Sequence, residues 1–225
     1  GREAAGRFAA RKGKALLTDA VSVRRDDQGI VSDHQNYGGV YSAVAAATHS
    51  APVITLRPGA VETRAEAASP EVRELEVEPS GRREADVISV TPVERTSNRP
   101  ELLTADKVVA GGVSLGDEDT FEELVGGLAD VLGAAVGATR SAVDEDQVDY
   151  EAQIGQTGVV VSPKLYIGVG ISGAVQHLVG MQTADTIVAI NSDEDAPIFD
   201  IADFGIIGDL FDLVPDIISE IEARK

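Results

Sequence analysis

Apolar residues follow two different rhythms along the second half of this chain. Short apolar runs with the length of buried strands occur at 107–110, 134–138, 158–161, 186–191 and 198–201. Between the first two of these runs, apolar residues recur at the i, i+3, i+4 spacing of an amphipathic helix, at Phe121, Leu124, Val125, Leu128, Val131 and Leu132. Strands that alternate with helices predict an α/β fold with a doubly wound parallel sheet, the Rossmann-like arrangement.

The C-terminal residues are predicted to be helical. The apolar residues expected on the buried face of this region are Ile206, Ile207, Leu210, Phe211, Val214, Ile217, Ile218 and Ile221. Pro215 interrupts this pattern. Because proline fits best in the first turn of a helix, we expect a new helix to begin there.

Residues 1–100 give weaker signals of the same fold class. A helix is expected over 3–14, and short strands are expected at 15–17, 21–23, 41–47, 52–56 and 86–93. Residues 62–84 are charged and have no stable period, which predicts an exposed loop. The polar run 95–100 ends in proline and is the expected linker. The chain is therefore predicted to contain a partial α/β domain over 1–100 and a Rossmann-like domain over 101–225.

The charge balance excludes several classes of partner. The chain has 38 acidic and 19 basic residues, a formal net charge of −19, so its surface repels nucleic acid and anionic membranes. The uncharged stretch 165–184 is nominally long enough to span a bilayer, but its glycines and polar residues favour strand, turn and helix. An acid-rich, lysine-poor surface suits high salt, so we expect a cytoplasmic prokaryotic protein, either from a halophile such as a haloarchaeon or simply acidic.

The absence of cysteine limits the chemistry further. Disulfides, thiolate nucleophiles and cysteine-held metal clusters are excluded, so any redox chemistry must belong to a bound organic cofactor. The acidic runs 117–119 and 193–195 are interpreted as a helix cap and a solvated loop rather than metal sites. The chain opens without methionine, and we expect it to be part of a longer protein.

A glycine pattern marks the strongest candidate site. Gly168, Gly170 and Gly173 form G-x-G-x-x-G after an apolar run, and Asp193 follows twenty positions past the last glycine. In this context the pattern predicts a dinucleotide site, with the phosphates over glycines that open a helix. The other strand ends expected nearby carry Gly111-Gly112, Thr139-Arg140 and Asn191, and the loop Gly155-Gln156-Thr157-Gly158 is expected to converge on the same place. Taken singly, each feature has a simpler explanation. Residues 155–158 could form an ordinary turn, Arg140 could be a solvated surface charge, and His177 could be a partly buried histidine with no ligand.

Together these loops resemble the α subunit of electron transfer flavoprotein. The matching segments are Gly137 to Asp144, Ile154 to Gly158, Val169 to His177, Ile190-Asn191 and Ala196 to Phe199. The close resemblance covers about 102–224, the FAD-binding domain of that family, and 1–60 resembles more weakly the end of its first domain. The resemblance implies that most of that first domain would precede residue 1.

The resemblance implies an electron carrier rather than an enzyme with its own substrate. It implies FAD, a heterodimer with a β subunit, and electron transfer from acyl-CoA dehydrogenases of fatty acid β-oxidation and related flavoenzymes to a membrane quinone oxidoreductase. A bifurcating relative that uses NADH, an NAD-dependent enzyme of the same fold and a scaffold without cofactor are the alternatives.

The resemblance also assigns residues to the cofactor. The expected FAD contacts are Thr139, Arg140, Ile154, Gly155, Gln156, Thr157, Ser172, Gly173, Ala174, Val175, Gln176, His177, Asn191, Asp209 and Leu210. Within this set, Arg140 should lie against the isoalloxazine ring with Thr139 beside it. Thr157 should form a hydrogen bond to the flavin near its reactive nitrogen.

Three further roles complete the assignment. Residues 172–176 should line the phosphates and the ribityl chain, and His177 should reach the pyrimidine side of the flavin ring. Asn191 and Asp209 should contact the adenosine, with Asn191 taking the role first expected of Asp193. Arg140 and His177 are expected to stabilise negative charge on the reduced ring. The chain departs from the family at Val113 and Ser114, where an arginine usually follows the Gly-Gly pair.

Overall fold

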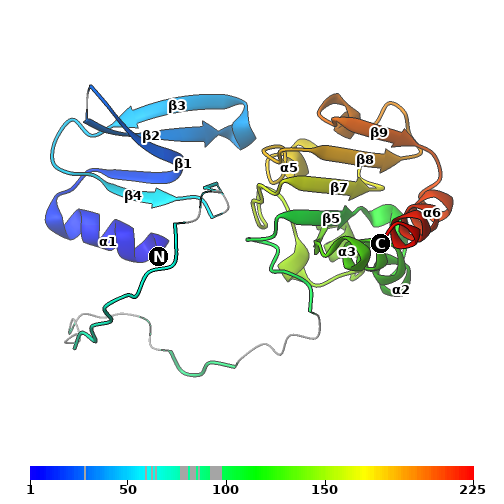
Figure 1. Cartoon of the computed structure of the whole chain (residues 1–225), viewed down its shortest axis with the longest axis horizontal. Helices are drawn as coiled ribbons and strands as arrows, with labels where there is room; N and C mark the ends of the chain where they lie inside the picture. Colours follow the sequence, from blue (N-terminus) through cyan, green and yellow to red (C-terminus); the bar gives the residue numbers. More distant parts are fainter. Residues whose placement is uncertain are drawn as a thin grey trace. The chain divides into compact units, whose positions relative to one another are not determined.

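The computed structural model describes residues 1–27, 29–58, 60–61, 63, 65–76, 81, 85, 87–91 and 98–225, with position 38 described by its backbone only. The chain separates into two compact units, Gly1–Val61 with Arg99–Lys225, and Glu62–Asn98. The first unit contains two sheets, which are described one at a time (Figure 1).

The C-terminal sheet is entirely parallel. Its strand order is β6-β5-β7-β8-β9, from β5 (Lys107–Gly111), β6 (Ala135–Ala138), β7 (Leu165–Val169), β8 (Ile187–Asn191) and β9 (Phe204–Ile207). The chain first adds β6 on one side of β5 and then adds β7 on the other side. The order therefore reverses between β5 and β7, and in open α/β sheets such a switch point is where ligands bind.

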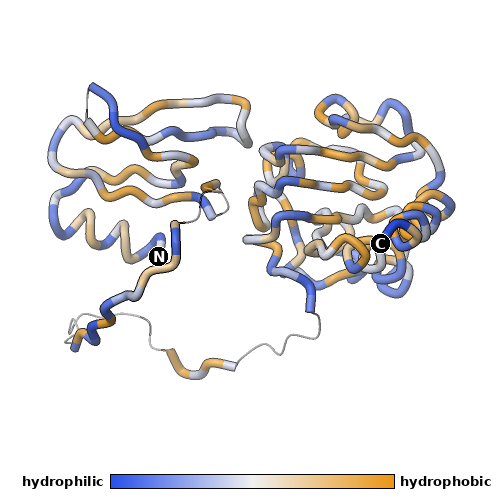
Figure 2. Tube along the Cα trace, viewed as in Figure 1, coloured by the Kyte–Doolittle hydropathy of each residue, from blue (hydrophilic) through white to orange (hydrophobic). Residues whose placement is uncertain are grey.

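Apolar side chains cover both faces of this sheet, which confirms the doubly wound fold class. Val109 on β5 packs into one core cluster, and its neighbours Val108 and Ala110 pack into a second. Figure 2 shows the strands of this sheet as largely hydrophobic. The helical elements are α2 (Glu118–Phe121), a π-helical turn (Glu122–Gly126), α3 (Gly127–Leu132), α4 (Arg140–Asp144), α5 (Val175–Leu178) and α6 (Leu210–Ala223), with 3₁₀ turns at Val113–Leu115, Tyr150–Ala152 and Pro197–Asp200.

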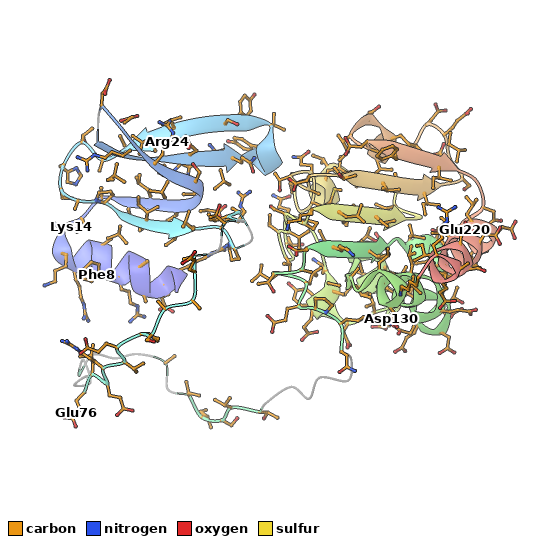
Figure 3. The ribbon with its side chains drawn as sticks, in the orientation of Figure 1. Phe8, Lys14, Arg24, Glu76, Asp130 and Glu220 are labelled. Carbon is orange, nitrogen blue, oxygen red and sulfur yellow. The ribbon has the colours of Figure 1, made fainter. Side chains whose placement is uncertain are left out.

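Arg99 connects the segment before β5 to the π-helical turn and to α3 through ion pairs. Its guanidinium donates to the carboxylates of Glu122 and Asp130, and its side chain is only 17% exposed. Asp130 lies on α3 (Figure 3). The carboxylates of Asp130 and Glu122 raise the pKa of Arg99 above its ordinary value, and the Arg99 guanidinium in turn lowers the pKa of Asp130. Gly126 makes room for this arrangement, because a side chain there would meet the Glu122 carboxylate.

The N-terminal sheet is mixed. Its order is β3-β2-β1-β4, from β1 (Leu16–Asp26), β2 (Gly29–Asn36), β3 (Tyr41–Ala46) and β4 (Val53–Leu56), with α1 (Arg2–Lys12) before it and a 3₁₀ turn at Tyr37–Gly39. The strands predicted at 15–17 and 21–23 are parts of one strand, β1, whose register shifts around Ala20. Asp19 next to this shift has φ 58°, and its carboxylate accepts a hydrogen bond of 2.8 Å from the buried Arg57 guanidinium.

Several predicted elements differ in the structure. Residues 158–161 form no strand, only a single bridge between Ile154 and Val159. Residues 198–201 lie mostly in the 3₁₀ turn Pro197–Asp200, because Pro197 sets a helical φ at its start. Ile206 and Ile207, expected on a helix, belong to β9 instead.

The C-terminal helix runs without a break from 210 to 223, with Pro215 inside it, so the prediction of a new helix there is wrong. Packing of its apolar stripe against α3 and the first core cluster outweighs the lost hydrogen bond. Two residues predicted to be buried are not, since Ile207 is 60% exposed and Phe211 is 50% exposed.

Part of the predicted interdomain region lies outside the described residues. The expected linker 95–100 is described only from 98 onward, and the strand expected at 86–93 is described only over 87–91, where no strand forms. The division into domains at residue 100 stays a prediction. Among the described helices, none has the length and apolar character needed to cross a membrane.

Candidate functional site

Two glycines bring the backbones of β5 and β7 together at the switch point. The N–H of Gly112 donates to the carbonyl of Val169 at 2.9 Å, and a Cβ on Gly112 would overlap the carbonyl oxygen of Gly170. Ser114 reinforces this contact, since its hydroxyl donates to the same Gly170 oxygen at 3.2 Å. The close approach leaves a pocket of about 740 Å³ beyond the carboxyl ends of the strands.

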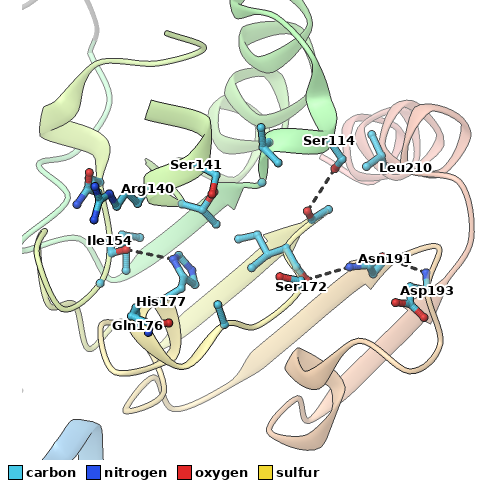
Figure 4. A pocket seen from close by; sticks show the side chains of 18 of the residues that line it. Ser114, Arg140, Ser141, Ile154, Ser172, Gln176, His177, Asn191, Asp193 and Leu210 are labelled. Atoms are coloured by element: carbon cyan, nitrogen blue, oxygen red, sulfur yellow. Dashed lines mark hydrogen bonds between the residues drawn. The ribbon is translucent and has the colours of Figure 1, made fainter. Parts of the chain in front are cut away.

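Most predicted cofactor residues line this pocket (Figure 4). The predicted residues in its wall are Thr139, Arg140, Ile154, Gly155, Gln156, Thr157, Ser172, Ala174, Gln176, His177, Asn191, Asp209 and Leu210. Gly173 and Val175 are not in the wall. The prediction omitted Gly112, Val113, Ser114, Ser141, Gln153, Gly170, Ile171, Ser192, Asp193 and Phe211, most of which flank predicted residues or follow a strand end.

The loop after β6 presents a cation to the pocket. The N–H of Thr139 donates to the Gly111 carbonyl at 3.0 Å, and its hydroxyl caps α4 by accepting from Ala142 at 3.4 Å. Arg140 is the first residue of α4, and its side chain is 69% exposed. Only Nε of this guanidinium has an acceptor among the described residues, Asp144 at 3.2 Å. The other N–H groups are available to a ligand.

The turn 153–159 is held from two sides. Gln153 Nε2 donates to the Thr157 hydroxyl at 3.0 Å, and the Tyr150 hydroxyl donates to the Thr157 carbonyl at 3.0 Å. Gly155 has φ 143° and lies against the carbonyl of Gln176, where a side chain would clash. These contacts fix the position of Thr157 in the wall of the pocket.

A run of free backbone donors follows β7. Gly170 has φ 63° and Gly173 has φ 92°, conformations that favour glycine. Within the part of the chain that the structure describes, the N–H groups of residues 171–174 have no acceptor. Successive unpaired N–H groups form a concave cradle suited to phosphate oxygens. The predicted helix start differs, however, because residues 170–174 form a loop and α5 begins only at 175.

His177 is buried, and both of its ring nitrogens are bonded to protein. Nδ1 lies 3.1 Å from the carbonyl oxygen of Ile154 (Figure 4), and Nε2 lies 2.7 Å from the Tyr166 hydroxyl. Burial lowers the pKa of His177 to about 4, so the ring is neutral near neutral pH. The charge stabilisation expected from Arg140 and His177 together therefore falls to Arg140.

Two residues expected at the adenosine end also shape the backbone. The amide of Asn191 donates to the Ile171 carbonyl at 2.9 Å, and its oxygen accepts from the N–H of Asp193 at 3.0 Å. Asp209 caps α6 by accepting from the N–H of Phe211 at 2.9 Å. Both side chains therefore position the wall as well as line it. Among the described residues, no group of three or more His, Asp or Glu is placed to hold a metal ion.

Comparison with known proteins agrees with this geometry. Residues 101–182 match the model of the electron transfer flavoprotein FAD-binding domain, and residues 1–80 match that of the electron transfer flavoprotein domain. The chain is 50% identical over its full length to electron transfer flavoprotein subunit alpha of Mycobacterium leprae (strain TN), covering 69% of that protein. The corresponding subunit of Mycobacterium tuberculosis (strain ATCC 25618 / H37Rv) is 48% identical, with the same coverage.

A eukaryotic relative is more similar over a shorter stretch. The probable mitochondrial electron transfer flavoprotein subunit alpha of Saccharomyces cerevisiae is 56% identical over 129 residues, 57% of this chain and 38% of that protein. Identity of this extent, together with the two family models, confirms the family that the loop residues indicate. The chain belongs to the alpha subunits of electron transfer flavoproteins, which are electron carriers rather than enzymes.

Proposed function

We propose that this chain binds FAD in the pocket at the β5/β7 switch point and carries electrons as one half of a heterodimer with a β subunit. The observation that carries the proposal is the convergence of three loops, 139–140, 155–157 and 171–177, on one pocket. These are the loops that carry the family resemblance, and no other cofactor is needed to explain their arrangement.

The residues of the pocket fit such a group. Its volume of about 740 Å³ falls within the usual range for cofactor sites. The free N–H groups of residues 171–174 would hold the pyrophosphate, and Arg140 with Thr157 would face the isoalloxazine. Asn191 and Asp209 would flank the adenosine end. When bound, FAD supplies the electron-transfer chemistry, which fits a chain that contains no cysteine.

The chain's own residues set the properties of that chemistry. The Arg140 guanidinium would place a fixed positive charge beside the ring, favouring the more negative, reduced state. His177 contributes a neutral part of the wall, because burial lowers its pKa to about 4. The tight backbone contact of Gly112 with Gly170 leaves no room for a side chain between the two loops that carry the site.

The electron donors and acceptors are proposed from the family resemblance. We propose that acyl-CoA dehydrogenases of fatty acid β-oxidation and related flavoenzymes donate the electrons, and that a membrane quinone oxidoreductase receives them. The formal charge of −19 would favour docking to basic surfaces on such partners. A cytoplasmic location in a prokaryote that lives in high salt is a further proposal, supported by the same acid-rich composition.

One experiment tests the function. The chain is co-expressed with the β subunit from its own source, and the visible spectrum of the purified pair is recorded before and after addition of an acyl-CoA dehydrogenase with its substrate. A flavin band that bleaches only with the complete donor system supports the proposal. Bleaching by NADH alone would indicate the bifurcating alternative, and a colourless pair that binds NAD would contradict the proposal.

A further inference from the structure

Gln153 is held rigidly behind Thr157. Its side chain is 3% exposed, and Nε2 donates to the Thr157 hydroxyl oxygen at 3.0 Å. The backbone of Gln153 is fixed as well, since its N–H donates to Tyr150 at 3.0 Å and its carbonyl accepts from Val159 at 2.7 Å. Gly158 packs so closely on this carbonyl that a side chain there would overlap it. Gln153 therefore presents its amide to Thr157 in one orientation.

This contact determines what the Thr157 hydroxyl can do. A hydroxyl has one proton to donate and two lone pairs with which to accept. Because the oxygen accepts from the Gln153 amide, its own proton must point in another direction. Thr157 lines the pocket, and its turn is held by backbone bonds from Gly155 to Val159 and from Gly158 to Gly155 as well as by the Tyr150 bond to its carbonyl.

We propose that Gln153 is a positioning residue that directs the Thr157 hydroxyl proton into the pocket, so that Thr157 is a hydrogen-bond donor toward the bound cofactor. This inference rests on the proposed function, because the recipient is the flavin ring. A donor at this position favours the more electron-rich, reduced ring, whereas an acceptor at the same position opposes it. Gln153 thus tunes the reduction potential through Thr157.

The test reverses the polarity of the contact. Gln153→Glu keeps the shape of the side chain but, when ionised, only accepts, so the Thr157 proton should turn toward residue 153. The midpoint potential of the FAD-loaded heterodimer is measured for the wild type, Gln153→Glu, Thr157→Val and the double variant at pH 8. The added charge of Glu acts in both backgrounds, but the reversal acts only where the hydroxyl is present.

We expect Gln153→Glu to lower the equilibrium constant for flavin reduction about fivefold more when residue 157 is threonine than when it is valine. A difference of this size corresponds to one net hydrogen bond. Tyr150→Phe is the matched control, because it removes the bond to the Thr157 carbonyl but leaves the bond to the hydroxyl. The equilibrium constant for flavin reduction in Tyr150→Phe should stay within twofold of the wild-type value. The inference would be overturned if Gln153→Glu shifted the midpoint potential equally with threonine and with valine at position 157. It would also be overturned if Tyr150→Phe shifted the potential as much as Gln153→Glu does.

A second readout needs no cofactor. In the FAD-free heterodimer, the side-chain amide protons of Gln153 should exchange slowly with solvent in ¹⁵N-edited NMR spectra and should lose that protection in Thr157→Val. Amide exchange that is unchanged by Thr157→Val would overturn the inference independently. A wild-type pair that takes up no FAD would instead contradict the proposed function, and the amide exchange would then decide the role of Gln153 by itself.

Discussion

The Tyr166 hydroxyl and the His177 Nε2 atom lie 2.7 Å apart, and the carbonyl at the other ring nitrogen fixes the tautomer of His177. The Ile154 carbonyl near Nδ1 can only accept, so Nδ1 carries the proton and Nε2 accepts from tyrosine. Burial raises the pKa of Tyr166, which keeps its hydroxyl protonated as the donor. The pair is thus a neutral, fully bonded unit.

Removing the tyrosine hydroxyl should destabilise the protein. Tyr166→Phe leaves the buried Nε2 atom without a donor, which should cost about 1–3 kcal/mol of unfolding free energy. Urea unfolding followed by circular dichroism measures the loss, and long-range ¹H–¹⁵N NMR spectra should show the Nδ1-protonated tautomer in the wild type. A wild-type ring protonated at Nε2 would be incompatible with the assignment.

The same histidine should make stability depend on pH. The unfolded ring takes up a proton near its ordinary pKa of 6.5, whereas the folded ring resists protonation down to about 4. Stability is therefore complete above pH 6.5 and falls as the pH drops, by about 2 kcal/mol between pH 6.5 and 5. Urea unfolding across this range measures the slope. His177→Gln, although less stable, should lack this part of the slope; an identical slope in both proteins would contradict the prediction.

Arg140 should control the reduction potential rather than the presence of FAD. Its side chain is mostly exposed and makes one ion pair, with Asp144, so its removal should leave the fold intact. Arg140→Ala should retain FAD but make its reduction less favourable by about tenfold, since a fixed charge beside the ring is lost. Arg140→Lys should restore part of the effect. Spectroelectrochemical titration distinguishes these outcomes, and an unchanged potential in Arg140→Ala would refute the role.

The close contact between the loops that follow β5 and β7 should tolerate no side chain at Gly112. In Gly112→Ala the Cβ would overlap the Gly170 carbonyl, so the two loops must separate and FAD should be lost. Gly127→Ala, on α3, is the matched control. Among the described residues its Cβ would meet Ile218 at 3.4 Å, an ordinary van der Waals distance. That change should be neutral or stabilise the helix by up to about 1 kcal/mol. Flavin content per protein, read from the absorption spectrum, compares the two; equal retention would argue against the close contact.

Sequence patterns predicted the parts of this fold in which local preference and burial agree. The strands around Val108, Ile167 and Val188 are apolar runs covered on both faces, and their length and β-branched residues indicate strands. Ile198 shows where this fails. It is fully buried and sits in an apolar run, but Pro197 starts a 3₁₀ turn there, and short apolar runs do not distinguish the two.

Position in the site was easier to predict than chemical state. The pocket residues follow strand ends, which sequence spacing and the family resemblance both identify. The state of His177 depends instead on Tyr166 and Ile154, 11 and 23 positions away in the chain, and only the fold brings them together. The role of Gln153 was missed for the same reason, because its amide matters only through the contact with Thr157.

Among the residues that the structure describes, those that line the pocket all fall between Gly112 and Phe211. Mutations accumulated before Gly112 therefore change no atom of the wall directly. Substitutions in the early part of such a chain are therefore under different constraints from those at the cofactor site. Sequence change among relatives should accordingly be distributed unevenly, with the slowest drift at the strand ends that surround Gly112 and Gly170.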